Sequence, residues 1–489
     1  MSVPLTQLYI DGRFVPSSTG ETFDVRSSYS GDVVGTAASA SSTDCRAAIE
    51  AAAKAFKTWE QTSLVERRNI FLKAASIVET EEWGKKLLEV VPQETSCAPY
   101  WVAHHPGVVA NMLRTQAGMV NFLRGELYPS ETAPGAQAIS QRRAKGVVFG
   151  IAPWNAPFPL TVNTIAAPII SGNTVVFKSS ELSPRSQSLV VDLFEQAGLP
   201  AGIFNFISIS RENAPALTAE IIAHPAIRIT NFTGSDRVGK IIAMESARHL
   251  KPCVLELGGK APAVVLDDAN VIEAAKAIVW GAMAHSGQVC MSTERVIVQS
   301  GIADKIVSAI KELSSQLKAG DLLTDPAARL GVLFSETSAD SVVQLLRDAK
   351  QHGAEIILGD ISNQGAVVQP HLVTNVKPGM RIWEKESFGP VIVFAVVNTV
   401  DEAIELANAS HYSLSASLWT SDLYAAQGIA ARIRAGATSI NGPTIHAEAT
   451  DSLLGLGGAS GYGRFHIESY TDKRVVVTHP LGRQYPLFM

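Results

Sequence analysis

The stretch from Val254 to Met291 decides how this chain is organised. It opens with Val254-Leu255-Glu256-Leu257-Gly258-Gly259-Lys260 and closes with Ser286-Gly287-Gln288-Val289-Cys290-Met291. Between these ends, apolar residues at helical spacing in 271–284 predict a helix. A carboxylate therefore follows a strand, and a thiol lies in a turn of small residues after the next helix. Because such a helix can return the chain across the top of a domain, we expect Glu256 and Cys290 to face one cleft.

Each half of this stretch also has an ordinary structural explanation. A lone cysteine is most often a small, buried apolar residue, and a Gly-Gly pair after a strand is most often only a turn. In one cleft, however, a thiol can act as a nucleophile, and a carboxylate can move protons or activate water. The two motifs together therefore favour a catalytic site.

Length and composition narrow the class of protein. With 489 residues, the chain exceeds what one hydrophobic core organises, so two or three domains are expected. The 46% hydrophobic and 18% charged residues indicate a well-buried globular enzyme, and a net charge of −5 argues against nucleic acid or an anionic membrane as partner. The uncharged segment 146–177 contains several prolines, so it predicts a strand, a loop and a buried helix rather than a membrane span.

The cysteines point to a reducing compartment. The four cysteines are scattered, with no Cys-x-x-Cys pair and no zinc-type Cys/His spacing, so free thiols and no metal site are predicted. The first residues, Met1-Ser-Val-Pro-Leu5, lack the basic and apolar regions of a secretory signal. A cytoplasmic location is the resulting expectation.

Strand and helix patterns alternate along most of the chain. Strands are expected at 146–151, 174–178, 204–207, 227–232 and 253–257, and helices at 160–170, 184–197, 213–223 and 236–249. This alternation predicts a doubly wound parallel sheet, which binds ligands outside the carboxyl ends of its strands. It resumes after Cys290 as a second α/β unit, entered at Gly258-Gly259.

The part before residue 146 predicts other elements. Asp11-Gly12 predicts the turn of a hairpin. Helices are expected at 43–59, capped by Thr43 or Asp44, and at 64–80 and 103–123. Residues 126–143 have weak patterning, so we expect an extended segment that projects from the main body. This segment can pair with the apolar run 474–478 or across a subunit boundary.

Polar groups follow several of the predicted strands. Asn155 lies in the proline-stiffened loop 152–157, where its amide can donate to a developing oxyanion. The ordinary alternative is a loop asparagine bonded to its own backbone. Lys178 and Glu181 can reach ribose hydroxyls, or form only a solvated ion pair. A carboxylate beside the 2′-position of the ribose favours NAD, because it would repel the 2′-phosphate of NADP. The positive charge of Lys178 has the opposite effect and favours NADP.

The segment Thr233-Gly234-Ser235 lies between a predicted strand and a predicted helix. Free backbone N–H groups at a helix start suit a pyrophosphate. The spacing is not the usual G-x-G-x-x-G, so the pattern by itself only permits a nucleotide site.

Several motifs together resemble one family. Glu256-Leu-Gly-Gly-Lys260 and Gly287-Gln-Val-Cys290 resemble the two signature motifs of the aldehyde dehydrogenase superfamily, and Phe232-Thr-Gly-Ser235 and Glu386-Ser-Phe-Gly-Pro390 are similar to its cofactor segments. The resemblance runs from Tyr9 to Phe465. It implies an α/β fold with a Rossmann-type cofactor domain of residues 1–125 and 144–256, an α/β catalytic domain of residues 257–458, and a small β oligomerisation arm of residues 126–143 and 470–489. It also implies a homodimer or homotetramer.

The resemblance also implies a reaction. Cys290 would be the nucleophile, Glu256 the general base, and Asn155 an oxyanion donor together with the Cys290 backbone N–H. An aldehyde would be oxidised to the carboxylic acid through a thiohemiacetal and a thioester, with NAD, or possibly NADP, as cofactor. The implied cofactor-binding residues are Ile151, Pro153, Trp154, Lys178, Glu181, Gly234, Ser235, Val238, Leu257, Glu386 and Phe388. The implied substrate pocket consists of Phe158, Asn163, Val289, Met291 and Leu454.

Within this superfamily, residues 284–295, 248–252 and 445–448 look most like the vanillin, salicylaldehyde and benzaldehyde dehydrogenases, which implies an aromatic aldehyde. Asn163 departs from that group, where arginine is frequent, and residues 453–458 replace its usual Pro-Phe-Gly-Gly run. An aliphatic aldehyde or semialdehyde is the alternative substrate.

Three other classes of protein remain as alternatives. A CoA-acylating dehydrogenase would normally lack Glu256. A cysteine hydrolase would need a histidine such as His285 paired with Cys290. A non-catalytic binding or structural protein on the same fold would not require Cys290, Glu256 and Asn155 together.

Overall fold

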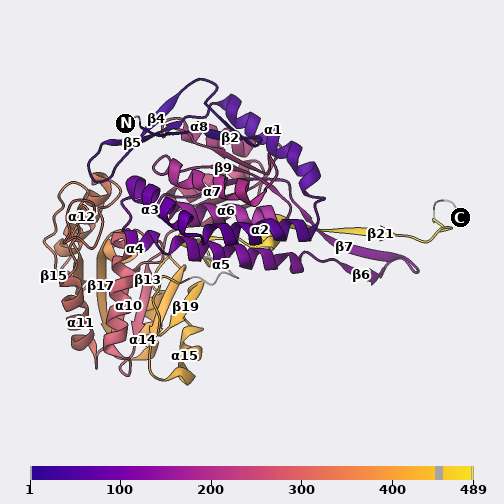
Figure 1. Cartoon of the computed structure of the whole chain (residues 1–489). Helices are drawn as coiled ribbons and strands as arrows, with labels where there is room; N and C mark the ends of the chain where they lie inside the picture. Colours follow the sequence, from indigo (N-terminus) through magenta and orange to yellow (C-terminus); the bar gives the residue numbers. More distant parts are fainter. Residues whose placement is uncertain (1–2, 447–454, 486, 488–489) are drawn as a thin grey trace.

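The computed structural model describes residues 3–446, 455–485 and 487. Its body consists of two layered α/β units, and a long ribbon of strands projects away from the first of them (Figure 1). Within the described residues, no helix is both long and apolar enough to cross a membrane.

The first unit is built on an eight-stranded sheet with the order β20-β12-β11-β8-β9-β10-β2-β3. The strands are β2 Leu8–Ile10, β3 Arg13–Val15, β8 Val147–Ile151, β9 Thr174–Lys178, β10 Phe204–Ile207, β11 Ile227–Thr233, β12 Cys253–Glu256 and β20 Gly461–Tyr462. The five from β12 to β10 are parallel, as predicted. Because β9 and β10 lie on one side of β8 and β11 and β12 on the other, the strand order reverses at β8, where such sheets bind ligands.

Helices cover both faces of this sheet. One face carries α2 Leu64–Val78, α3 Glu81–Thr95, α5 His105–Gly118, α6 Pro157–Ile170 and α7 Pro184–Ala197, and the other carries α1 Ser42–Trp59, α8 Ala214–Ala223 and α9 Asp236–Arg248. Strand residues alternate between the two cores: Val148 packs into the first and Val147 into the second. Helix α6 is buried along its whole length, so the uncharged segment forms a strand, a loop and a buried helix as predicted.

Three features of the N-terminal part can be compared with the predictions from sequence: a hairpin turn, a helix cap and helix α3. Asp11 and Gly12 have φ of 51° and 78°, as a two-residue hairpin turn requires. The cap of α1 is Ser41, not Thr43 or Asp44, because the Ser41 hydroxyl accepts from the Asp44 N–H at 3.2 Å while the Asp44 carboxylate accepts from the Ser41 N–H at 2.8 Å. Helix α3 was not predicted, since Gly84 and Pro92 interrupt its pattern.

The second unit is built on a seven-stranded sheet with the order β15-β16-β17-β14-β13-β18-β19, in which β15 alone is antiparallel to its neighbour. The strands are β13 Ala261–Val265, β14 Thr293–Gln299, β15 Glu355–Leu358, β16 His371–Thr374, β17 Val391–Val397, β18 Ser415–Trp419 and β19 Ala437–Ile440. The main helices are α10 Val271–Met283, α11 Ala303–Ser315, α12 Glu336–Gln351, α14 Val400–Asn408 and α15 Leu423–Ala430. Helix α10 is the one predicted between Glu256 and Cys290. Strands β13, β16 and β18 were not predicted.

Short elements complete the chain. They are the sheet of β1 Leu5–Thr6, β4 Thr22–Arg26 and β5 Val33–Ala38, and the helices α4 Pro99–Val102, α13 Arg381–Glu384 and α16 Ile467–Tyr470.

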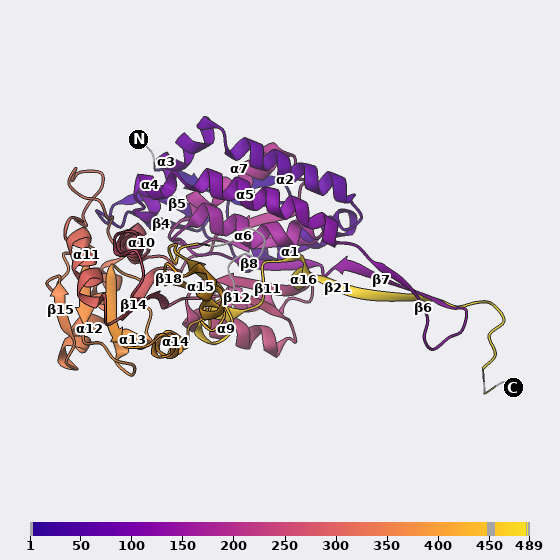
Figure 2. The ribbon, with the colours of Figure 1, turned by 90° about the horizontal axis from the view of Figure 1, so that it is seen from below.

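The projecting ribbon is a three-stranded antiparallel sheet of β6 Glu126–Pro129, β7 Gln137–Ala144 and β21 Thr471–Thr478 (Figures 1 and 2). Strand β21 pairs with β7 from Thr471↔Ala144 to Thr478↔Gln137. The predicted pairing of the two distant segments is therefore confirmed. Strand β20 is an addition, because residues 461 and 462 return to the sheet of the first unit, beside β12.

Candidate active site

The carboxyl ends of the central strands meet at one edge. Ile151 is in register with Lys178 on one side and with Phe232 on the other, and Thr233 is in register with Glu256. The loops that follow these strands therefore carry Asn155, Glu181, Gly234 and the Gly258-Gly259 pair to the same edge, as the sequence predicted.

The turn before Cys290 has an unusual backbone. His285, Ser286 and Gly287 have φ of 48°, 56° and 78°, a left-handed run that is costly for the two residues with side chains. Hydrogen bonds fix it: the Ser286 hydroxyl donates to the Gly331 carbonyl at 2.7 Å, and the Gln288 side chain accepts from the Phe334 N–H at 2.9 Å. A Cβ on Gly287 would collide with the Gly389 carbonyl. The turn thereby places Cys290, a residue of intermediate exposure, beside the edge of the first sheet.

Glu256 and Cys290 lie together, as expected. Burial raises the pKa of Glu256 to about 7, and the Cys290 thiol and Thr233 hydroxyl partly oppose this rise. Burial, followed by the negative charges of Glu256 and Glu386, holds the pKa of Cys290 well above its usual value. At neutral pH the site therefore contains a protonated thiol next to a carboxyl group that can accept a proton.

The strand that ends in Glu256 is supported from a distant part of the chain. Glu256 pairs with Gly461 of β20, and the Ser460 hydroxyl donates to the Gly258 carbonyl at 2.8 Å. A Cβ on Gly259 would collide with the Cys290 carbonyl oxygen. The two contacts with residues 460 and 461 fix the strand end that carries Glu256, and the collision at Gly259 explains why glycine lies next to the nucleophile turn.

Asn155 does not follow the ordinary alternative of a loop asparagine bonded to its own backbone. Its side chain is 5% exposed, and Nδ2 donates to the Gln288 carbonyl at 2.9 Å, two residues before Cys290. That bond uses one of the two N–H groups of the amide. The other N–H is not used by this bond.

His285 is engaged elsewhere. Its Nε2 lies 3.4 Å from Cys97 Sγ, and its ring stacks on Trp101 with an interplanar angle of 15°. Burial lowers the pKa of His285 to about 3, so the ring is neutral. His285 therefore does not form with Cys290 the Cys–His pair that a cysteine hydrolase would need.

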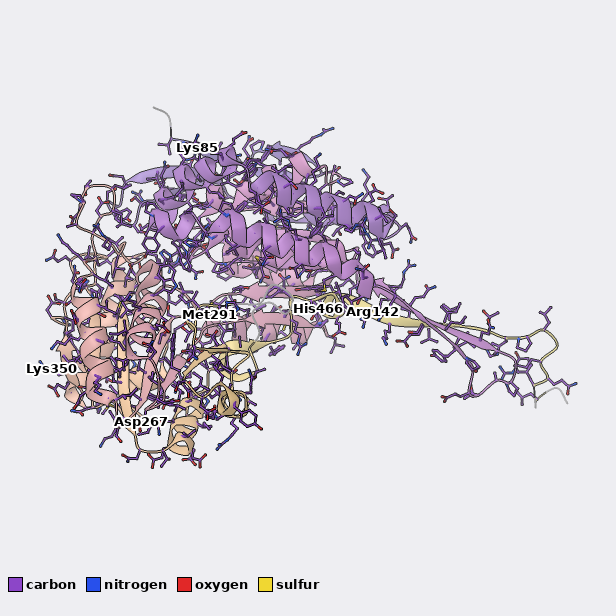
Figure 3. All side chains as sticks on the ribbon, turned by 60° about the horizontal axis from the view of Figure 1, so that its bottom comes forward. Lys85, Arg142, Asp267, Met291, Lys350 and His466 are labelled. Carbon is purple, nitrogen blue, oxygen red and sulfur yellow. The ribbon has the colours of Figure 1, made fainter. Side chains whose placement is uncertain are left out.

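An apolar group surrounds Cys290. Val289 and Met291 pack with Leu414, and Trp101 and Ile445 complete the cluster; Figure 3 labels Met291, which lies between the two units. No sequence motif pointed to Trp101, which is brought in by the short helix α4.

Two other predicted pocket residues, Phe158 and Asn163, are not members of that cluster. Phe158 is fully buried in the helical core against Trp83, with ring centroids 5.9 Å apart. Asn163 is buried on α6. Leu454 lies outside the described residues.

Several groups fit a dinucleotide. Lys178 is 7% exposed, and its Nζ donates to the Ser179 carbonyl at 2.9 Å, which leaves two N–H groups for ribose hydroxyls. Ser235 caps α9, where its hydroxyl accepts from the Val238 N–H at 3.4 Å. Gly239 lies directly against Leu257, so α9 approaches the strand end closely. This geometry suits a pyrophosphate at a helix start.

The turn at Glu386 and Phe388 reaches the same place from the second unit. Glu386 Oε1 accepts from the Gly259 N–H at 2.9 Å, and the Phe388 ring meets Trp154 edge-on with ring centroids 6.1 Å apart. Burial, followed by the charge of Glu294, raises the pKa of Glu386 to about 8. The predicted cofactor residues of both units therefore converge, including Pro153 and Trp154 after β8.

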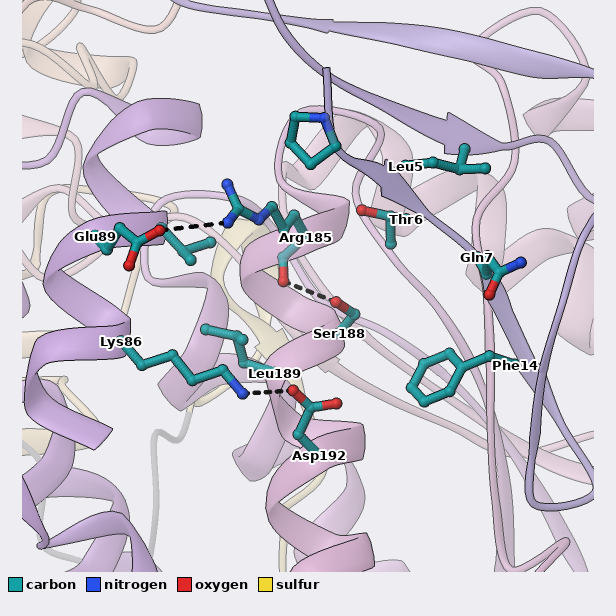
Figure 4. A pocket seen from close by; sticks show the side chains of 12 residues that line it. Leu5, Thr6, Gln7, Phe14, Lys86, Glu89, Arg185, Ser188, Leu189 and Asp192 are labelled. Atoms are coloured by element: carbon teal, nitrogen blue, oxygen red, sulfur yellow. Dashed lines mark hydrogen bonds and ion pairs between the residues drawn. The ribbon is translucent and has the colours of Figure 1, made fainter. Parts of the chain in front are cut away.

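The rest of the described molecule offers no metal cluster and one separate cavity of note. Across the described ranges, no group of three or more His, Cys, Asp or Glu residues is arranged to hold a metal ion. A cavity of about 330 Å³ lies between β1, α3 and α7, with the Lys86–Asp192 and Arg185–Glu89 ion pairs on its wall (Figure 4). It shares no residue with the site at Cys290.

A buried carboxylate, a thiol and a Rossmann-type sheet edge define a class of enzyme that oxidises carbonyl compounds through a covalent bond to sulfur, with a nicotinamide cofactor. The model of the Aldehyde dehydrogenase family matches residues 14–478, and the chain belongs to that family. It is an NAD(P)-dependent aldehyde dehydrogenase.

Its similarity to known members extends over their whole length. The chain is 40% identical to a vanillin dehydrogenase of Pseudomonas fluorescens over 484 residues, which are 98% of this chain and 99% of that protein. The structure of a salicylaldehyde dehydrogenase from Pseudomonas putida, complexed with salicylaldehyde, matches with a TM-score of 0.94 at 36% identity and covers 99% of this chain and 100% of that one. An NAD-dependent aldehyde dehydrogenase from Sinorhizobium meliloti matches with a TM-score of 0.92 at 32% identity, over 100% of this chain and 97% of that one.

Proposed function

We propose that the enzyme oxidises aromatic aldehydes at Cys290. The observation that carries this proposal is the apolar cluster against which Cys290 packs, because Trp101, Val289, Met291 and Ile445 are apolar side chains of the kind that an aromatic ring contacts favourably. The similarity to vanillin and salicylaldehyde dehydrogenases supports the same substrate class.

In the proposed first half of the reaction, the Cys290 thiol loses its proton to solvent and the sulfur bonds to the aldehyde carbon. The carbonyl oxygen becomes an oxyanion, which accepts from the free N–H of Asn155 and from the Cys290 backbone N–H. When bound, NAD(P) accepts the hydride of that carbon. Loss of the hydride converts the thiohemiacetal into a thioester on Cys290.

In the proposed second half, Glu256 takes a proton from water, and the resulting hydroxide attacks the thioester. The carbon–sulfur bond breaks, the carboxylic acid leaves, and Glu256 gives its proton to the sulfur, which restores the thiol. A carboxyl group with a pKa of about 7 suits this task, because it can hold and release a proton at neutral pH.

The test is a comparison of substrates. Purified enzyme is given NAD with vanillin, salicylaldehyde, benzaldehyde, an aliphatic aldehyde or a semialdehyde, and NADH formation is followed by absorbance with and without CoA. We expect kcat/KM to be at least about 10-fold higher for the aromatic aldehydes, since the ring adds a few kcal/mol of apolar contact, and no requirement for CoA. A preference for the aliphatic substrates would contradict the aromatic assignment, and dependence on CoA would contradict the hydrolytic one.

The cofactor preference follows from Glu181, which lies after β9 near Lys178. A carboxylate there would repel a 2′-phosphate, so we expect a higher kcat/KM with NAD than with NADP. Initial rates are measured at increasing concentrations of NAD and of NADP, for the unaltered enzyme and for Glu181→Gln. The ratio of kcat/KM with NAD to kcat/KM with NADP should be smaller in the variant. A preference for NADP in the unaltered enzyme would show that Lys178 dominates.

We also propose that the enzyme is a homodimer or homotetramer assembled through the ribbon of β6, β7 and β21. Support comes from its projection out of the body (Figure 2) and from the apolar side chains it exposes, including Leu127, which is 65% exposed, and Val476, which is 55% exposed.

We also propose a division of the chain into domains. Residues 1–125 and 144–256 form the cofactor domain, and residues 257–458 form the catalytic domain.

The assembly proposal makes a prediction about mass in solution. A lysine at Val476 places a charge among the exposed valines of β21, so Val476→Lys is expected to shift the mass measured by light scattering toward the monomer. Val396→Lys is the matched control, because Val396 is 58% exposed on β17, away from the ribbon. Equal masses for all three proteins would contradict assembly through the ribbon.

We propose a cytoplasmic location for the enzyme. The four cysteines are free in the structure, including the nucleophile, and a reducing compartment keeps such thiols unoxidised. Fractionation of producing cells, with detection of the enzyme in the cytoplasmic fraction, is the corresponding test.

A further inference from the structure

Lys260 and Glu294 form an ion pair in the interior of the molecule. The two residues are 1% and 3% exposed, and Lys260 Nζ contacts Glu294 Oε2 directly. Removing both charges from water is costly, and a buried ion pair is often no more stabilising than apolar residues of the same volume. The pair therefore calls for an explanation other than stability.

Glu294 has a second set of contacts. Its Oε1 accepts from the Ser387 N–H at 2.9 Å and from the Phe388 N–H at 3.3 Å, and its Oε2 accepts from the Ser387 N–H at 3.0 Å. Phe388 has a φ of 50°, a left-handed conformation that needs support from its surroundings. The carboxylate thus holds the backbone of the turn that carries Glu386 and Phe388.

Lys260 connects this turn to the strand of the general base. It follows Gly258-Gly259 directly, and the Gly259 N–H donates to Glu386. The Lys260 carbonyl accepts from Arg295 Nε at 2.8 Å, which joins it to the strand after Cys290. A single ion pair therefore links three segments, which carry Glu256, Cys290 and Glu386.

We propose that Lys260 and Glu294 are positioning residues, which fix the turn of Glu386 and Phe388 relative to Cys290 and so align the nicotinamide half of the cofactor with the thiol. This inference rests on the proposed function of the site. Neither side chain touches the reacting atoms. Their effect passes through the backbone N–H groups of Ser387 and Phe388 and through Gly259.

The experiment separates alignment of the cofactor from the integrity of the thiol site. Unaltered enzyme and the double variant Lys260→Met/Glu294→Gln are assayed in two reactions: oxidation of benzaldehyde with NAD, and hydrolysis of 4-nitrophenyl acetate without it. The ester reaction needs a thiol nucleophile and a water-activating carboxylate but no hydride acceptor. Because a hydrogen bond to a charged acceptor is lost, we expect kcat/KM for NAD to fall about 10- to 100-fold, with ester hydrolysis and the melting temperature near those of the unaltered enzyme.

Further variants guard against misfolding of the double variant. Glu294→Asp keeps the charge but shortens the side chain, so it is expected to lose part of the NAD-dependent rate and to retain ester hydrolysis. Glu60→Gln is the matched control, because it removes a partly buried ion pair with Arg143 away from the site and should change neither reaction.

The outcomes are distinguishable. Equal losses in both reactions would assign the pair to general folding, and unchanged NAD kinetics would show that the turn is held without it; either result overturns the positioning role while the proposed function stands. An unaltered enzyme that oxidises no aldehyde would overturn the proposed function and the inference together.

Discussion

Cys290→Ala is expected to lose aldehyde oxidation by about 10⁴-fold or more, the scale on which removal of a nucleophile acts in covalent catalysis. Alanine lacks the sulfur on which the thiohemiacetal and thioester form. NAD binding should be unchanged, because the residues that fit the dinucleotide lie at the ends of β8, β9 and β11 and in the turn of Glu386 and Phe388, and the substitution alters none of them. Steady-state NADH formation measures the first effect, and titration of protein fluorescence with NAD measures the second.

Cys253→Ala is the matched control for this variant. Cys253 is also partly exposed, and its thiol lies 3.1 Å from the Tyr462 hydroxyl, at the opposite end of β12 from Glu256. Its replacement should leave the rate close to that of the unaltered enzyme. Turnover near the normal rate in Cys290→Ala would remove Cys290 from the role of nucleophile.

Glu256→Gln is expected to separate the two halves of the reaction. Glutamine preserves the shape of the side chain but cannot take a proton from water, so hydrolysis of the thioester should slow by about 10²- to 10⁴-fold, the usual contribution of a general base. Hydride transfer should be affected less. The expected time course is a burst of NADH that is stoichiometric with the enzyme, followed by a slow steady state.

Rapid quenching and mass measurement of the protein test this expectation, since the acyl group should accumulate on Cys290. If Glu256 only stabilises the turn at Gly258-Gly259, glutamine would serve equally well. The variant would then turn over at the normal rate with no accumulated thioester, and another residue would have to activate water.

The pH dependence provides an independent test of the same role. Burial raises the pKa of Glu256 to about 7, and a general base acts in its deprotonated form. The rate of thioester hydrolysis should therefore be low below pH 7 and rise as the pH passes through about 7, whereas Glu256→Gln should lack this rise. The Cys290 thiol should also ionise at lower pH in the variant, because the neighbouring negative charge that raises its pKa is gone.

Much of this site follows from local sequence. The alternation of strands and helices places strand ends at one edge of a parallel sheet, and the residues directly after those ends, including Asn155 and Gly234, are found there. Glu256 and Cys290 meet because α10 has the length and apolar pattern that return the chain to the same edge. Each of these inferences depends on a periodic pattern or on a short motif.

Other parts depend on contacts between distant segments, for which a single sequence offers no local signal. Trp101 reaches the thiol from a helix of four residues, which has no period to recognise. The pairing of Lys260 with Glu294 and the hydrogen bonds of Glu294 to Ser387 and Phe388 join residues that are far apart in the chain. Strands β13 and β18 were missed because they are short and rich in alanine or serine, and β13 contains a proline.

The pairing of β12 with β20 has a consequence for the enzyme during its synthesis on the ribosome. A nascent chain that has emerged as far as residue 454 contains the thiol, the general base and the residues that fit the cofactor. It still lacks Ser460 and Gly461, which hold the strand ending in Glu256. The order of translation therefore leaves Glu256 without this support until residues 460 and 461 have been added, so a chain that stops before them presents Cys290 to cellular aldehydes without a fixed base to release the product.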